Sequence, residues 1–126
     1  MTLEEENKKI IRRFYEEFHN AGPSDERHPD VLNEIMDSNF VSDNPPIQGR
    51  EAFKQAVAEI YAKYTGMKTS YGTMVAEGDK VAVRWRAKSK QITMTGITIF
   101  ILRSGKIVEG LNNPNVIESN TLSPND

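Results

Sequence analysis

Cysteine is absent from this 126-residue sequence, and so are the short motifs that bring most kinds of reactive chemistry to a protein. Without cysteine there can be no disulfide bond, no thiol nucleophile and no thiolate metal site. Neither a glycine-rich phosphate loop nor a Gly-x-Ser-x-Gly nucleophile motif occurs. The two histidines, His19 and His28, have no partner at the spacing of metal ligands. We therefore expect no metal ion, no nucleotide and no other cofactor.

A strong charge of either sign and long apolar runs are also absent. The 16 Lys and Arg residues against 18 Asp and Glu residues give a net charge of −2, which argues against nucleic acid or an anionic membrane as the main partner. No apolar run approaches the roughly 20 residues of a transmembrane helix. The acidic first residues, Met-Thr-Leu-Glu-Glu-Glu, lack the basic and apolar regions of a secretory signal, so we expect a cytoplasmic protein.

The length and composition fit one globular domain. A chain of 126 residues, 37% of them hydrophobic and 27% charged, is large enough for one hydrophobic core. We predict a single domain over residues 1–126, with an ordered core over residues 1–118. The polar residues 119–126 are expected to form a frayed tail.

The first half of the chain has the pattern of helices, because its apolar residues recur every three or four positions. A capping-box pattern, Thr2 followed by Glu5, marks the first helix start. Glycine and proline residues separate the helical segments from one another. The expected helices are residues 3–21, residues 29–36 and residues 50–65, with a short extended segment at residues 40–41.

The second half is rich in β-branched and aromatic residues and predicts an antiparallel sheet. Tight turns at Gly78-Asp79 and Ser104-Gly105 separate neighbouring strands. Trp85 alternates with arginines and should lie on the inner face of the sheet. The expected strands are residues 67–76, 80–87, 92–103 and 106–118. Helices followed by a curved sheet predict an α+β fold whose natural cavity lies between the two layers.

Four sets of residues, taken in order, carry a resemblance to a known family. They are Arg-Phe-Tyr-Glu-Glu at 13–17, Asp-Asn-Pro-Pro at 43–46 with Gly-Arg-Glu-Ala-Phe at 49–53, Glu-Gly-Asp-Lys-Val-Ala-Val-Arg-Trp at 77–85, and Gly-Ile-Thr-Ile-Phe at 96–100 with Gly-Lys-Ile-Val-Glu at 105–109. In this order the sequence resembles the SnoaL-like polyketide cyclase family of the nuclear transport factor 2-like superfamily. The resemblance implies a cone-shaped α+β barrel, in which three N-terminal helices pack in a strongly curved, mostly antiparallel sheet.

The same resemblance implies how such a protein works. It implies an apolar pocket at the open end of the cone and a homodimer formed through the outer face of the sheet. It also implies acid–base chemistry at a carbon next to a carbonyl, without metal or cofactor, with one carboxylate on the final strand and histidines elsewhere. Because this fold also hosts isomerases, dehydratases, epoxide hydrolases and pure binding domains, the resemblance does not fix the reaction.

The sequence departs from the family pattern at three places, and two of these departures, the lost acid and the shortened loop, subtract from catalysis. On the final strand, the positions at which the resemblance implies an acid hold Asn112 or Asn115, and an amide cannot accept a proton at neutral pH. Asp43 stands where the family frequently has a histidine. The usual long loop between the second and third strands is reduced to the four polar residues 88–91.

The candidate catalytic residues are Asp43, Asn112 and Tyr61. Asp43 would act as a base if the pocket rim desolvated it, and Asn112 and Tyr61 would donate hydrogen bonds to a ligand carbonyl. Each has a structural alternative: an Asx turn for Asp43, a bend for Asn112 and plain core packing for Tyr61. The expected ligand-binding residues are Tyr15, Phe40, Phe53, Tyr64, Trp85 and Asn115.

Two functions from different classes stay open. One is binding of a small hydrophobic molecule, with or without a carbonyl group, and no catalysis. The other is a cofactor-free cyclase, isomerase or lyase. An epoxide hydrolase is less favoured, because no Asp–Arg–Asp relay can be assembled from the sequence. The enzyme is favoured if Asp43 shares one enclosed pocket with Asn112 and Tyr61, and the binding protein is favoured if Asp43 points to solvent.

The third expected strand has apolar residues on both of its faces. Its side chains alternate, with isoleucines at 97, 99 and 101 on one face and Thr98, Phe100 and Leu102 on the other. One layer of helices can cover only one of these faces. We therefore expect the other to be buried against a second copy of the chain, giving a homodimer.

Overall fold

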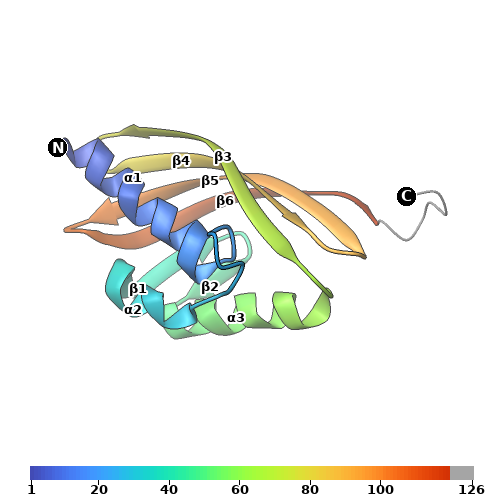
Figure 1. Cartoon of the computed structure of the whole chain (residues 1–126). Helices are drawn as coiled ribbons and strands as arrows, with labels where there is room; N and C mark the ends of the chain where they lie inside the picture. Colours follow the sequence, from blue (N-terminus) through green and yellow to red (C-terminus); the bar gives the residue numbers. More distant parts are fainter. Residues whose placement is uncertain (120–126) are drawn as a thin grey trace.

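A curved sheet with helices packed against one side dominates the computed structural model, which describes the backbone of residues 1–119 and the side chains of residues 1–116 (Figure 1). The tail expected at residues 119–126 lies, beyond Ser119, outside the described residues. The elements in chain order are helix α1 (Leu3–Arg13), a π-helical turn (Phe14–Phe18), a 3-10 turn (Pro29–Val31), helix α2 (Leu32–Ile35), strands β1 (Met36–Asp43) and β2 (Pro46–Gln48), helix α3 (Arg50–Lys63), and strands β3 (Lys68–Glu77), β4 (Lys80–Lys88), β5 (Ile92–Arg103) and β6 (Lys106–Ser119).

The described strands form one six-stranded sheet in the order β2-β1-β6-β5-β4-β3. Within it β1 pairs with β6 in parallel, and the other neighbours pair antiparallel. The sheet is not closed, since β2 and β3 lie at its two edges. Figure 1 shows α1 and α3 beneath the arch formed by β3 to β6. The predicted α+β arrangement of helices against a mostly antiparallel, curved sheet is therefore confirmed.

The long strands lie within about one residue of their predicted bounds. Gly78 and Gly105 adopt the positive φ angles of +60° and +77° that their tight turns require. The turn between β4 and β5 has no glycine and is made by Ser89 instead. The Ser89 Oγ accepts hydrogen bonds from the backbone N–H groups of Gln91 and Ile92, both at 3.1 Å. A serine hydroxyl thus takes the place of turn glycine.

The second predicted helix is shorter than expected, and this prediction was wrong at its end. Met36 begins β1 rather than ending the helix, and it pairs with Ile107 of β6. The side chain of Met36 is fully buried. An apolar residue at this position fits the spacing of either a helix or a strand, so the long-range pairing with β6 decides.

The first predicted helix changes its geometry before it ends. The Phe14–Phe18 segment is a π-helical turn, in which the His19 N–H donates to the Phe14 carbonyl at 3.0 Å. A π turn holds one more residue than an α turn. As a result Phe14, Tyr15 and Phe18 are all buried, and the following residue, His19, enters the interior between the helices and the sheet.

The outer face of the sheet is partly apolar. Ile97 and Ile99 are 52% and 37% exposed, whereas Thr98, Phe100 and Leu102, on the opposite face of β5, are buried.

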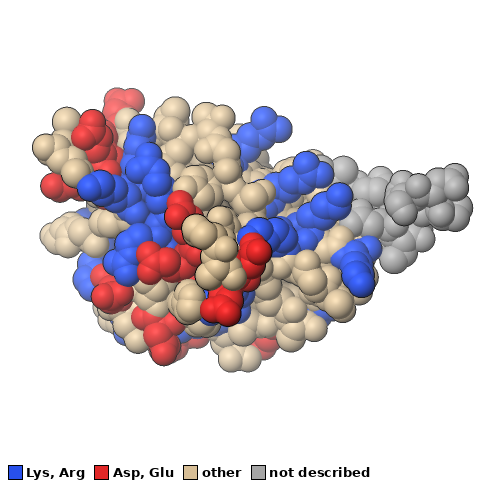
Figure 2. Space-filling model, in the orientation of Figure 1, with Lys and Arg blue, Asp and Glu red and all other residues tan. Residues whose placement is uncertain are grey.

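On the face of the molecule in Figure 2, basic and acidic side chains are interspersed. None of the helices in the described residues has the length and apolar character needed to cross a bilayer.

Candidate functional site

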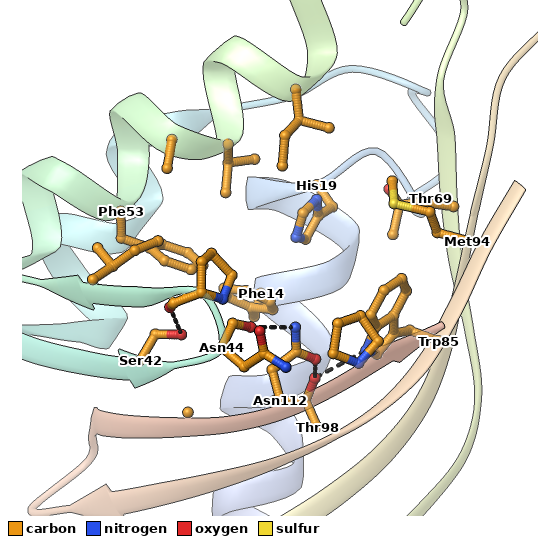
Figure 3. A pocket seen from close by; sticks show the side chains of 18 of the residues that line it. Phe14, His19, Ser42, Asn44, Phe53, Thr69, Trp85, Met94, Thr98 and Asn112 are labelled. Carbon is orange, nitrogen blue, oxygen red and sulfur yellow. Dashed lines mark hydrogen bonds between the residues drawn. The ribbon is translucent and has the colours of Figure 1, made fainter. Parts of the chain in front are cut away.

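A pocket of about 270 Å³ lies between α3, the π turn and the inner face of the sheet (Figure 3). Most of its wall is apolar and aromatic. Ring-bearing residues lining it include Phe14, Phe40, Phe53, Trp85 and Phe100. Cavities of this kind, apolar with a few polar groups, are typical binding sites for small molecules.

Two glycines give the aromatic walls their shape. An added Cβ at Gly96 would lie 2.4 Å from the Trp85 ring, and one at Gly110 would lie 3.2 Å from the Phe40 ring. A side chain at Gly96 would clash with the Trp85 ring, whereas one at Gly110 would push the Phe40 ring by only a few tenths of an ångström. A side chain at position 96 would push the indole of Trp85 out of its present place, so Gly96 helps to keep the pocket open.

One polar cluster reaches the pocket from the helical side. The Tyr61 hydroxyl of α3 lies 2.9 Å from the Nδ1 of His19 and 2.6 Å from the Oγ1 of Thr69 on β3. The guanidinium carbon of Arg27 lies over the Tyr61 ring, 4.3 Å from its centre. These contacts fix the C-terminal half of α3 over the pocket.

Burial changes the protonation of this cluster. Burial, together with the nearby positive charge of Arg27, lowers the pKa of His19 to about 3. His19 lines the pocket, and its ring contacts those of Phe14, Tyr15 and Phe18. Burial likewise raises the pKa of the Tyr61 phenol. His19 and Tyr61 are therefore both neutral at ordinary pH.

A second polar cluster reaches the pocket from the sheet. The Trp85 Nε1–H donates to the Thr98 hydroxyl at 2.9 Å, and that hydroxyl donates to the Asn112 Oδ1 at 2.7 Å. The Asn112 Nδ2 donates to the Asn44 carbonyl at 3.0 Å. Because the Thr98 hydroxyl accepts from Trp85, it donates to Asn112, and the Asn112 atom that it contacts is therefore the amide oxygen. Burial raises the pKa of the adjacent Tyr15 phenol, opposed by a hydrogen bond with Thr98.

The structure brings six of the nine sequence-predicted site residues into this pocket. They are Tyr15, Phe40, Phe53, Tyr61, Trp85 and Asn112. Tyr64 and Asn115 are not among the residues that line it. Tyr64 follows α3 and packs beneath the Lys63 ammonium, and Asn115 is exposed on β6.

Asp43 is exposed at the end of β1 and does not line the pocket. Its Oδ1 accepts a hydrogen bond from the backbone N–H of Asn112 at 2.9 Å. This contact extends the parallel pairing of β1 with β6, which ends at Ser42 and Gly110. Together with the Asn44 carbonyl, the Asp43 carboxylate orients Asn112 toward the pocket.

Sequence reasoning missed His19, Thr69 and Thr98 as pocket residues. A signal for His19 was present, since it lies four positions after Tyr15 and continues the apolar stripe of the first helix. Thr98 alternates with Phe100 on the inner face of β5, which also places it toward the cavity. Thr69 gave no such signal.

No aspartate or glutamate lines the pocket within the described residues. Its titratable groups there are Tyr15, His19 and Tyr61. No group of three or more His, Cys, Asp and Glu side chains in the described chain is placed to hold a metal ion. The arrangement can enclose an apolar molecule and offer it neutral hydrogen-bonding groups from two sides.

Comparison with known proteins gives a family match and several similar structures. A model of the SnoaL-like domain family matches residues 11–110. A proposed SnoaL-like polyketide cyclase from Jannaschia sp. CCS1 has a TM-score of 0.77 and 21% identity, covering 91% of this chain and 89% of that one. No curated protein sequence matches the chain.

Two further structures have the same architecture. A nuclear transport factor 2-like protein of unknown function from Mesorhizobium loti has a TM-score of 0.71 and 23% identity, covering 94% of this chain and 96% of that one. IdmH, a proposed polyketide cyclase from Streptomyces antibioticus, has a TM-score of 0.69 and 21% identity, covering 86% and 91%. At these identities the similarity concerns the fold, and it confirms the predicted cone shape.

Acid should destabilise the fold through His19. Its pKa is about 6.5 when unperturbed and about 3 in the folded protein, so between these pH values the unfolded chain binds one more proton. The free energy of unfolding should then fall by about 1.4 kcal/mol for each pH unit below 6.5. Between pH 7 and pH 5 the wild-type protein should therefore lose about 2 kcal/mol of unfolding free energy through His19, and His19→Gln should not show this loss. Urea denaturation at the two pH values measures the difference.

The other histidine provides the control for this measurement. His28 is exposed, and His28→Gln should leave the pH dependence of the wild-type protein unchanged. If His19→Gln lost stability between pH 7 and pH 5 as steeply as the wild type, the neutral state of His19 would be contradicted.

Proposed function

Because the chain belongs to the SnoaL-like domain family, whose model matches residues 11–110, we propose that it binds a small, uncharged, mainly hydrophobic molecule in the pocket. The family resemblance drawn from the sequence is thereby confirmed, and the ligand is the proposal. One observation carries it: within the described residues the pocket has apolar walls and no carboxylate. A charged ligand group would lose its hydration there without gaining a counter-ion.

The size of the pocket limits the ligand. An apolar protein cavity of about 150 Å³ holds a benzene molecule, and this one measures about 270 Å³. A body of one or two rings therefore fits inside. The side chain of Ile60 on α3, which lines the pocket and is 38% exposed, lies where a larger molecule could extend toward solvent.

The polar groups support a ligand that carries a carbonyl or another oxygen acceptor. The Asn112 amide uses one of its two N–H hydrogens on Asn44, which leaves the other for a ligand. Trp85 and Thr98 are already engaged with one another and with Asn112.

We also propose that residues 1–126 act as one cytoplasmic domain, as the composition predicts.

Filling the pocket with a larger side chain should weaken ligand binding. Ala56 lines the pocket on α3, whereas Ala58 is exposed on the same helix. We expect Ala56→Phe to weaken binding of one- and two-ring ketones and hydrocarbons at least about tenfold, because the new ring occupies the cavity. Ala58→Phe should leave it unchanged. Thermal shift and quenching of Trp85, the one tryptophan of the chain, report binding.

The pocket proposal fails under either of two results. If no compound of this panel raised the melting temperature of the wild-type protein, binding of molecules of this size would be rejected. If Ala56→Phe and Ala58→Phe bound equally well, the ligand would occupy another place.

The second candidate function is a cofactor-free cyclase, isomerase or lyase. One observation favours it: Asp43 contacts the backbone of Asn112, and Asn112 and Tyr61 share one pocket. In that case Asp43 would act as the base after moving toward the pocket. Its exposure and its hydrogen bond to Asn112 favour binding without catalysis. An epoxide hydrolase has less support, because it needs carboxylates in the pocket.

Two single substitutions, Asp43→Asn and Asn112→Asp, distinguish a binding protein from an enzyme. For a binding protein, Asp43→Asn should change ligand affinity by less than about threefold, whereas Asn112→Asp should weaken it at least about tenfold. A carboxylate at 112 would face the Asn44 carbonyl, which now accepts the Nδ2 hydrogen, and would bring charge into an apolar cavity. Turnover of a carbonyl or epoxide compound by the unmodified protein, lost in Asp43→Asn, would establish the enzyme instead.

We further propose a homodimer formed through the outer face of the sheet. An apolar row crosses four strands there, from Val75 through Ala82 and Ile99 to Leu111, in register. Arg84 lies on one side of this row and Glu109 on the other, opposite Ile97 and Ile101 respectively. A two-fold axis through the row would bring Arg84 of each copy toward Glu109 of the other.

A charge in the middle of this row should separate the two copies. We expect the wild-type protein to have twice the chain mass of 14.3 kDa in light scattering, and Ile99→Asp to have the mass of one chain, because the interface would bury an unpaired carboxylate. Ala58→Asp, on the exposed side of α3, should stay dimeric. A wild-type mass of one chain at micromolar concentration would refute the dimer.

A further inference from the structure

His19 is held in the pocket wall by aromatic rings and one hydrogen bond. The ring centres of Phe14, Tyr15 and Phe18 lie 5.1, 5.8 and 5.0 Å from that of His19. Its Nδ1 lies 2.9 Å from the Tyr61 hydroxyl. Figure 3 shows the imidazole directed from the helical side into the pocket, toward the sheet that carries Asn112.

The partners of Tyr61 decide which nitrogen of His19 carries the proton. Thr69 is buried, and within the described residues its hydroxyl has one hydrogen-bond partner, the Tyr61 hydroxyl at 2.6 Å. If Tyr61 donated to Thr69, the Thr69 hydrogen would be left without an acceptor, and a buried orphan donor is costly. The hydrogen bonds therefore run from Thr69 to Tyr61 to the Nδ1 of His19. In a neutral ring this places the hydrogen on Nε2.

We propose that the Nε2–H of His19 donates a hydrogen bond to the ligand, and that the ligand presents an uncharged acceptor oxygen, such as a ketone oxygen, to it. This inference rests on the proposed function of the pocket and names the ligand chemistry that the helical side selects. Tyr61 and Thr69 act as positioning residues, because they contact His19 and one another and fix the tautomer.

Arg27 strengthens the selection against cations. Its guanidinium carbon lies 4.3 Å from the Tyr61 ring centre and 5.1 Å from that of Phe18, and its Nε donates to the Phe18 carbonyl at 3.1 Å. The charged or titratable groups around His19 are thus Tyr15, Tyr61 and Arg27, and Arg27 supplies the one formal charge among them. A positive charge over the Tyr61 ring opposes an imidazolium and an ammonium-bearing ligand alike.

The tautomer can be measured without any ligand. Ring ¹⁵N spectra of histidine-labelled protein contain one pair of nitrogen signals, Nδ1 and Nε2, for each of the two histidines, and His28→Gln identifies the pair from His19. At pH 7 we expect His19 to be neutral with the hydrogen on Nε2, and Thr69→Val to weaken this preference because it removes the first donor. A hydrogen on Nδ1, or an imidazolium at pH 7, would overturn the proposal.

Three probes with one bicyclic body test the ligand chemistry: 1-indanone with a carbonyl, indane without a polar group, and 1-aminoindane with an ammonium group. We expect 1-indanone to bind about tenfold tighter than indane, the effect of one neutral hydrogen bond, and 1-aminoindane not to bind. The Nε2–H signal of His19 should shift on adding 1-indanone and not on adding indane. Equal affinity for 1-indanone and indane would overturn the proposal.

Variants at position 19 provide the matched comparison. His19→Leu should bind 1-indanone and indane with about equal affinity. His19→Gln, which keeps an N–H donor, should retain part of the preference for 1-indanone. His28→Gln should keep the full preference. If His19→Leu kept the preference, another group would be the donor and the proposal would fail. Binding of none of the three probes would reject the pocket function for such molecules, while the ¹⁵N spectrum would still decide the tautomer.

Discussion

The aromatic residues of the π turn are the contact on which the other parts of the structure depend. Phe14 meets Phe53 of α3 at 6.1 Å and Phe100 of β5 at 5.1 Å between ring centres. Tyr15 stacks on Tyr71 of β3 at 5.3 Å. Each such pair contributes about 0.5–1.5 kcal/mol beyond its buried area. Because one short turn touches both layers, it sets their separation and thereby the width of the pocket.

The two polar clusters differ in what they leave to a ligand. On the sheet side, the last residue of β1 and the residue after it hold Asn112 from two directions, through the Asp43 carboxylate and the Asn44 carbonyl. The amide is therefore built into the sheet, and an acid in its place would meet an oxygen. On the helical side, His19 and Tyr61 are neutral because they are buried. Both sides consequently present hydrogen-bond donors without charge, which suits a neutral acceptor.

Sequence patterns predicted the fold well where local chemistry controls it. Strand alternation and turn glycines placed β3 to β6, and the interior position of Trp85 followed from its alternation with Arg84 and Arg86. Long-range pairing controls the rest. The position of Asp43 depends on parallel contact with β6, about 69 residues later, and no local pattern tells which way its carboxylate points. The π turn has the same apolar spacing as an α-helix, so the change of helix geometry emerged only from the structure, although the apolar stripe already pointed His19 inward.

Helix α3 has an unusual place between the cavity and the solvent. Val57 is the one buried residue of its 14, because the residues that would face a core in another protein face the pocket. Without a ligand, this helix depends on Phe53 near its start and on the Tyr61 hydrogen bonds near its end. It is therefore the element expected to unfold locally first, with the fastest amide hydrogen exchange among the helices. Since a bound molecule would supply the missing contacts, the resistance of the chain to proteolysis would rise with ligand concentration, and the amount of intact protein would follow the supply of its ligand.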